Sequence, residues 1–224
     1  MTAVITGDIA GYTRLGIDDR ERLILSLKEF FVSLSSDLND FDIRFEIIRG
    51  DSFQGRTSAK DGFRTALMIK CFLNTLSSVH EGVMRRPLSI RAARDARIAI
   101  GFGNVDFHTD RISESDGEAF WYSGRLLDEM KSKKQFIKVM SRSQEFNEEM
   151  DVHCLLLEAV MSKWSIPQAE VVLEKLKGKK DYEIADSLDT TRQAMSSRAR
   201  NAGWHAIESL LERVDYLIKS KELF

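Results

Sequence analysis

The order in which strand-like and helix-like patterns follow one another most limits the fold of this chain. Alternating or continuous apolar runs predict five strands, and apolar residues at helical spacing predict three helices between them. The strands are expected at 3–9, 41–47, 52–57, 96–107 and 136–140, and the helices at about 19–38, 59–78 and 118–131. After residue 141 every pattern is helical. The sequence therefore predicts an α/β sandwich in the order β-α-β-β-α-β-α-β, followed by helices alone.

The change of pattern near residue 141 predicts two domains, because mixed runs followed by helices alone usually form separate units. We expect an α/β domain at residues 1–142 and an all-α domain at 143–224. Residues 79–94, which include Pro87, fit neither pattern and are expected to form a loop.

Three pairs of residues resemble capping boxes and predict where helices begin. In each pair a capping residue is followed three positions later by an acid or an amide. Asp18 with Glu21, Ser58 with Asp61, and Thr190 with Gln193 each have the required spacing. Gly178 and Gly203 are expected to end helices in the tail.

Composition excludes some function classes. The chain has 43% apolar residues, 30% charged residues and a net charge of −2, so it has no overall attraction to nucleic acid or to an anionic membrane. Cys71 and Cys154 lie inside helical apolar patterns and are expected to be buried. The chain has neither a signal-peptide pattern nor an apolar run long enough to span a bilayer, so we expect a cytoplasmic protein without a membrane partner.

Two aspartates lie where strands end. Asp8 ends the first strand, and Asp51 lies in the turn between the second and third. If these strands are neighbours, both carboxylates lie at one edge of the sheet, where a hard divalent ion such as Mg²⁺ or Mn²⁺ would offset their repulsion. The alternative is structural, because aspartate and glycine are also common turn formers.

Glycines flank the first aspartate. Gly7 and Gly11 would let the backbone from Ile9 to Tyr12 approach a phosphate, with the N–H groups of Ala10, Gly11 and Tyr12 as donors. This predicts a phosphate-binding segment directly after the first strand.

Four segments resemble class III nucleotide cyclases. They are ITGDIAGYTRL (5–15), RGDSFQ (49–54), ARIAIGFGNV (96–105) and GEAFWYSGRLLDEM (117–130). The resemblance covers about residues 3–140 and implies a cyclase-like sandwich that is ferredoxin-like at its centre. It implies metal ligands at Asp8, Ile9 and Asp51, bound nucleoside triphosphate, and a catalytic Arg125 that stabilises transition-state charge.

Three positions depart from the cyclase pattern. Trp121 falls where the family has its catalytic asparagine, Ile47 falls where adenylyl cyclases usually have a base-reading lysine, and Glu114 lies near the other base-selecting position. These departures predict a degenerate domain that binds a nucleotide without cyclising it. The pattern also resembles SatD-type bacterial proteins, which carry a cyclase-like domain and a helix-turn-helix tail.

Residues 182–203 predict two short helices joined by a turn at Asp189 and Thr190. Met195, Ala199 and Ala202 are expected to face inward. The segment resembles the helix-turn-helix of sigma-factor-type regulators, with the whole unit at about 167–203. The resemblance implies that the second helix binds double-stranded DNA in the major groove, where arginine and glutamine suit guanine and adenine edges. The implied DNA-binding residues are Thr191, Arg192, Gln193, Ser196, Ser197 and Arg200.

The charge of the tail favours an alternative. Residues 166–224 hold ten basic and ten acidic side chains, which gives little nonspecific attraction to phosphates. The tail would then be a helical hairpin that packs on the first domain or on a second subunit. An apolar stripe on the preceding helix, at about 143–164, is expected to be core or dimer interface; it comprises Phe146, Met150, Leu157, Val160, Met161 and Trp164.

The sequence therefore predicts a nucleotide-binding, DNA-binding transcription regulator with a degenerate cyclase-like domain, and a homodimer is one candidate assembly. One alternative is an active, metal-dependent nucleotidyl cyclase whose site is shared across a dimer. The other is a structural interaction module without catalysis.

Overall fold

A computed structural model gives the fold for the whole chain except residues 41, 77–94, 108–110, 134 and 221–224. Five strands form one sheet in the order β2-β3-β1-β4-β5. Only β4 and β5 are parallel, and the other neighbours are antiparallel. The strands are β1 (Thr2–Ile9), β2 (Arg44–Arg49), β3 (Ser52–Ser58), β4 (Ala96–Gly103) and β5 (Ile137–Met140).

The predicted order β-α-β-β-α-β-α-β is confirmed, and the chain after β5 is helical through residue 219. The helices are α1 (Ile17–Asp37), α2 (Ala59–Thr75), α3 (Glu118–Lys133), α4 (Gln144–Met161), α5 (Ile166–Leu176), α6 (Asp181–Ser187), α7 (Arg192–Asn201) and α8 (Trp204–Lys219). The expected loop at 79–94 lies outside the described residues. Among those described, no helix is long and apolar enough to cross a membrane.

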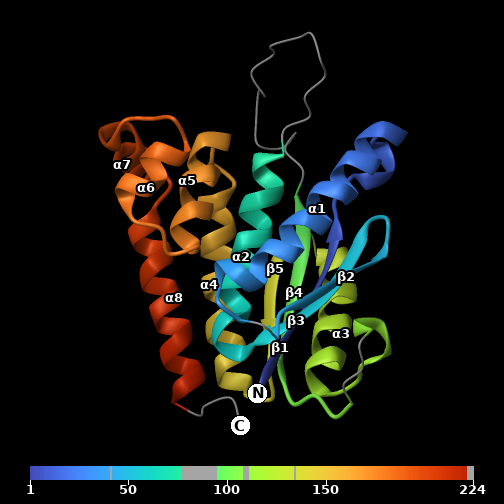
Figure 1. The fold of residues 1–224 in the computed structure, drawn as a ribbon. Coiled ribbons are helices and arrows are strands. Elements are labelled where there is room, and N and C mark those ends of the chain that lie inside the picture. The colour runs from blue at the N-terminus through green and yellow to red at the C-terminus, as the bar shows by residue number, and fades with distance from the viewer. Residues whose placement is uncertain (41, 77–94, 108–110, 134, 221–224) are drawn as a thin grey trace.

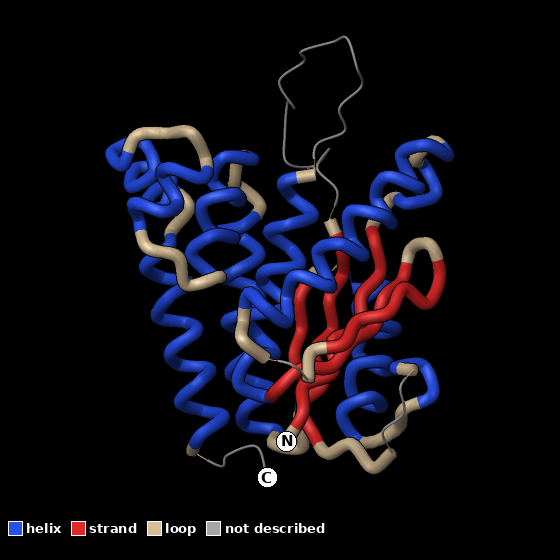
Figure 2. Tube along the Cα trace, viewed as in Figure 1, coloured by secondary structure: helices blue, strands red, loops and turns tan. Residues whose placement is uncertain are grey.

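Each face of the sheet is covered by different helices, as Figures 1 and 2 show. Alternate residues of β1 point to opposite faces. Ala3 and Ile5 belong to the core that includes α1 and α2, whereas Val4 packs with Ala119 and Phe120 of α3. The candidate residue Asp8 shares the strand parity of Val4, so it belongs to the α3 face.

Helix α2 is the centre of the molecule. It is buried along most of its length because the sheet covers one side, and α5 and α8 cover the other. Close packing requires glycine at residue 62, since a Cβ there would lie 2.3 Å from the Cβ of Ala3. An apolar helix without a polar face needs such cover on both sides.

The tail helices extend the core of the sheet. Phe146 of α4 meets Phe102 of β4 edge to face, with ring centroids 5.9 Å apart. Phe146, Met150, Leu157 and other members of the predicted stripe are buried in this core, so the stripe is core. One apolar core includes residues from both sides of the predicted domain boundary between residues 142 and 143. The division into two domains stays a prediction.

Two of the predicted helix starts are wrong by one or two residues. Helix α1 begins after Gly16, so Asp18 lies inside its first turn, where it complements the helix dipole. Thr191, rather than Thr190, caps α7, and its hydroxyl accepts a hydrogen bond from Ala194. The Ser58 cap and the glycines that follow α5 and α7 are as predicted.

Candidate functional site

The backbone places Asp51 beside the end of β1. Asp8 pairs with Ser52 across the β1–β3 ladder. One residue further, the Ile9 N–H donates to the carbonyl oxygen of Asp51 at 2.7 Å. The end of β1 therefore lies beside the turn between β2 and β3, as predicted. Residues 8, 9 and 51 lie together at one end of these strands.

Arg97 of β4 binds the carboxylate of Asp8. Its Nε donates to Oδ1 at 2.8 Å, and its Nη2 donates to Oδ2 at 2.7 Å. Both side chains are largely buried, and the hydrogen bonds that Arg97 donates to Asp8 raise the pKa of Arg97 above its ordinary value. Arg97 is not among the site residues that the sequence predicts. The available signal was a lone arginine between Ala96 and Ile98 in an otherwise apolar strand.

This ion pair tests whether Asp8 fits a divalent cation. Both carboxylate oxygens accept hydrogen bonds from Arg97, whose positive charge already lies opposite them. Mg²⁺ or Mn²⁺ would have to displace the guanidinium to reach either oxygen. The described residues also include no group of three histidine, cysteine, aspartate or glutamate residues that suits a metal ion. The arrangement at Asp8 therefore does not fit a metal ion. The side chain of Ile9 is buried and has no ligand atom, so Ile9 could bind a metal only through its backbone carbonyl.

The segment expected to bind phosphate is partly used by the fold. The Ala10 N–H donates to the carbonyl oxygen of Asp95 at 2.8 Å, so it is not available to a phosphate. Gly11 has a φ of 75°, and a Cβ there would have nothing within 4 Å. The backbone at Gly11 is therefore open, which leaves Gly11 and Tyr12 as the candidate donors.

A buried lysine that the sequence does not predict as a site residue fixes the adjoining end of β4. Lys70 of α2 is only 2% exposed. Its Nζ donates to Asp95 Oδ1 at 2.7 Å and to the carbonyl oxygen of Ala96 at 2.9 Å. Because Asp95 also accepts from Ala10, this lysine holds the start of β4 against the end of β1.

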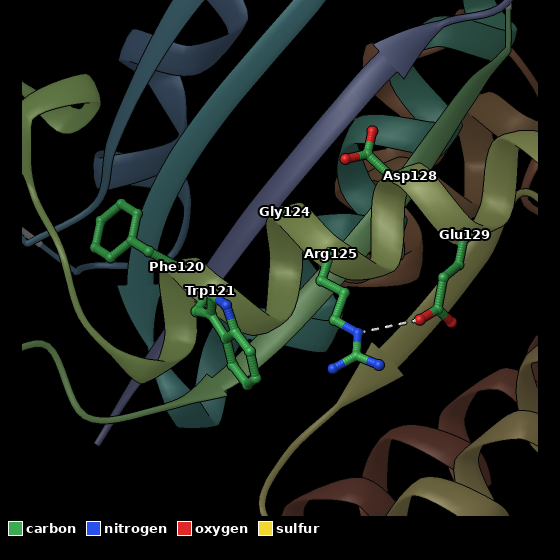
Figure 3. A pocket seen from close by; sticks show the side chains of 6 residues that line it. All are labelled: Phe120, Trp121, Gly124, Arg125, Asp128 and Glu129. Carbon is green, nitrogen blue, oxygen red and sulfur yellow. Dashed lines mark hydrogen bonds and ion pairs between the residues drawn. The ribbon is translucent and has the colours of Figure 1, made fainter.

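Arg125 lies on the face of α3 that points away from the sheet. On the opposite face, the Ser123 hydroxyl is buried and accepts a hydrogen bond from Thr6 at 2.9 Å. Figure 3 shows Arg125 beside Trp121, in a shallow hollow. Its guanidinium lies 5.6 Å from the Trp121 ring and pairs with Glu129 at 3.3 Å. Within a single chain, the predicted catalytic residue Arg125 is therefore not beside Asp8.

The other cyclase-like positions are also separated. Ile47 pairs with Phe53 across the β2–β3 ladder and packs against the core. Glu114 is exposed and pairs with Arg111 at 3.3 Å. Neither side chain shares the hollow of Arg125.

Helices α5, α6 and α7 form a compact unit with its own small apolar cluster. Helix α6 leads into α7 through a short turn in which Asp189 has a φ of 44°. The Thr190 N–H donates to the carbonyl oxygen of Ala185 at 3.0 Å and fixes this turn. The buried members are Val171, Ile184, Ala185, Met195 and Ala199.

The opposite face of α7 is open to solvent. The residues expected to bind DNA are exposed, except Ser197, which is half-buried; they are Thr191, Arg192, Gln193, Ser196, Ser197 and Arg200. The Arg192 guanidinium lies 5.9 Å from the Tyr182 ring of α6, a cation–π contact that orients it. Arg200 makes no ion pair with the described residues.

Most other basic groups near this unit are neutralised. Lys175 pairs with Asp181 at 2.6 Å, and Lys177 and Lys179 both pair with Glu174. Burial raises the pKa of Glu170, and the charge of Arg198 acts against that rise. Among the described residues of the unit, the exposed basic groups without an ion pair are Lys180, Arg192 and Arg200.

Comparison with known proteins leaves the family of this chain open. No protein-family model matches the sequence, and no curated protein matches it. A solved structure described as a bacterial light-regulated adenylyl cyclase is 15% identical, with a TM-score of 0.37. The alignment covers 62% of this chain and 74% of that one. A likeness this distant assigns neither a fold family nor an activity to this chain.

Proposed function

We propose that the protein is a DNA-binding regulator that contacts the major groove through α7. The observation that carries this proposal is the exposed, acid-free face of α7, set on a compact three-helix unit. We infer that α6 and α7 act as a helix-turn-helix, in which the second helix of the pair enters the groove.

The side chains on this face suit base edges. Gln193, Ser196 and Arg200 follow one another at three- and four-residue spacing, so they project from the same side of α7. Arginine binds guanine through two hydrogen bonds, and glutamine binds adenine in the same way. The capping hydroxyl of Thr191 lies at the helix start, near where the phosphate backbone would pass.

The charge distribution predicts how the protein binds. Ion pairs neutralise several nearby lysines, so few phosphates would be contacted by free positive charge. We therefore expect weak binding to random DNA and measurable affinity only for a preferred sequence.

The test is selection of duplexes from a random library with the full-length protein. The comparison protein carries Arg192→Ala, Gln193→Ala and Arg200→Ala together, all at exposed positions that leave the core intact. Enrichment of a shared sequence motif by the wild type alone supports the proposal. Failure of the wild type to enrich any motif rejects it.

A second candidate function is nucleotide binding after β1, without a metal ion. One observation favours it: the backbone at Gly11 is open and adopts a left-handed conformation, which is common in anion-binding turns. Titration calorimetry with each nucleoside triphosphate, with and without Mn²⁺, tests it. Binding that does not need Mn²⁺ and is lost in Gly11→Pro supports this candidate, and no heat with any nucleotide rejects it.

The cyclase alternative makes a different prediction in the same samples. Product formation with any nucleoside triphosphate and Mn²⁺, abolished by Asp51→Ala and Arg125→Ala, would establish an enzyme. Because Arg125 and Asp8 are separated within one chain, turnover would need a site shared between two copies. If a nucleotide does bind, repeating the DNA measurement in its presence shows whether occupancy shifts DNA affinity.

A further inference from the structure

Helix α4 carries a second apolar stripe, opposite the one that enters the core. Val152, Leu155 and Leu156 are 57%, 52% and 62% exposed, and Ala159 is exposed as well. Their three- and four-residue spacing places them on one face of the helix. Three neighbouring large apolar side chains in water form a patch of the kind that marks an interaction surface.

The fold fixes the orientation of this stripe. On one flank of α4, Glu158 accepts hydrogen bonds at 2.7 Å from the N–H groups of Phe136 and Ile137, beside β5. On the other flank, Glu149 pairs with Arg213 of α8 at 2.8 Å. The helix is held from both sides, as its place between β5 and α8 in Figure 1 indicates, and it cannot roll to bury the stripe.

We propose that this stripe binds the same stripe of a second copy of the chain, with the two α4 helices antiparallel. A two-fold axis midway between Leu155 and Leu156 places each of these residues opposite the other. The same axis places Val152 opposite Ala159 of the second copy, so a larger side chain meets a smaller one. Such alternation suits close packing of two helices.

Charge complementarity at the ends of the stripe identifies the occupant as a second copy. Glu148 lies one turn before Val152, and Lys163 lies four residues after Ala159; both are exposed. The two-fold axis that pairs the leucines also places Glu148 opposite Lys163 of the second copy. Two identical ion pairs therefore form, one at each end of the stripe, with Lys163 just past the last residue of α4. Lys163 makes no ion pair with a described residue of its own chain.

The size of the patch predicts the strength of the dimer. Stable interfaces bury about 800 Å² on each partner, more than one helix face usually supplies. We therefore expect a dissociation constant in the micromolar range. This inference does not depend on DNA or nucleotide binding.

The test is sedimentation equilibrium of the full-length protein over a range of concentrations. Wild type should change from monomer to dimer, and Leu156→Glu should remain monomeric. Val32→Glu is the matched control, because Val32 is also an exposed apolar residue on a helix, at 78% exposure, but lies on α1. It should dimerise like wild type, and circular dichroism should show that all variants fold.

A charge exchange tests the antiparallel register. Glu148→Lys alone and Lys163→Glu alone should each weaken the dimer about tenfold, because each places like charges together. The double variant, Glu148→Lys with Lys163→Glu, should regain most of the wild-type affinity. A wild type that stays monomeric at several hundred micromolar, or a double variant no better than the singles, would overturn the proposal.

Discussion

The carboxylate of Asp8 and the guanidinium of Arg97 form a two-point ion pair between the central strands β1 and β4, with N–O distances of 2.8 and 2.7 Å. The pair occupies the position in which the sequence predicts a metal ion. Burying a charged carboxylate lowers the stability of the fold unless a cation lies beside it. Here that cation is the guanidinium of Arg97.

Removal of Arg97 should therefore destabilise the protein. We expect Arg97→Ala to lower the free energy of unfolding by about 1–3 kcal/mol, because it leaves Asp8 charged and partly desolvated. In urea denaturation, the double variant Asp8→Ala/Arg97→Ala should be less destabilised than the sum of the single variants. Arg14→Ala, an exposed arginine, is the control. Strict additivity would show that the two side chains are not coupled.

Millimolar Mn²⁺ should leave the melting temperature of the wild type unchanged, because Arg97 already holds both oxygens of Asp8. Differential scanning calorimetry with and without the ion measures this. An increase that is absent in Asp8→Asn would show that the guanidinium gives way to metal, and it would restore the metal-site prediction.

Two glycines that meet α3 should respond in opposite ways to alanine. A Cβ at Gly101 would lie 2.2 Å from the carbonyl oxygen of Ala119, so Gly101→Ala should push α3 away from the sheet and cost about 1–3 kcal/mol. Gly124 lies within α3 with nothing within 4 Å of its Cβ position, so Gly124→Ala should stabilise the protein by about 0.5–1 kcal/mol. Equal effects in thermal unfolding would contradict this packing.

The ion pair between α4 and α8 predicts a pH dependence. The hydrogen bond from Arg213, helped by His153, lowers the pKa of Glu149 below its ordinary value. A lowered carboxyl pKa stabilises the fold above the unfolded value, about 4.3, and this contribution is lost as the pH falls through the folded value. Because the pair is partly exposed, the effect should be below about 1 kcal/mol.

Glu149→Gln should therefore be less stable than wild type at pH 7, and the difference should shrink near pH 3. Glu145→Gln, on the same helix, is the control and should follow the wild-type profile. A constant difference between Glu149→Gln and wild type across this pH range would contradict the assigned cause.

The sequence predicted each strand and helix of the α/β part because apolar periodicity is a local signal. It could not show which surface each helix covers. The inward stripe of α4, with Phe146 and Met150, had two readings, and only its contact with Phe102 identifies it as core. The outward stripe around Leu156 was hidden because α4 is apolar on two faces.

The site was less predictable than the fold for a similar reason. Asp8 and Arg97 are far apart in the sequence, and no local pattern pairs them. Lys70 has the sequence environment of a helix surface, yet it is buried against Asp95, Ala96 and Phe136, which are distant in the sequence. The open face of α7 was predictable, because Met195 and Ala199 define the buried side within one short helix.

DNA binding by α7 is best measured as the affinity of the full-length protein for a duplex obtained by selection. Fluorescence anisotropy should show that Arg200→Ala binds that duplex at least about tenfold more weakly than wild type, since one good base contact is worth about 1–3 kcal/mol. Arg125→Ala, an exposed arginine on α3, should bind like wild type. Equal affinities of wild type and Arg200→Ala for the selected duplex would contradict the account.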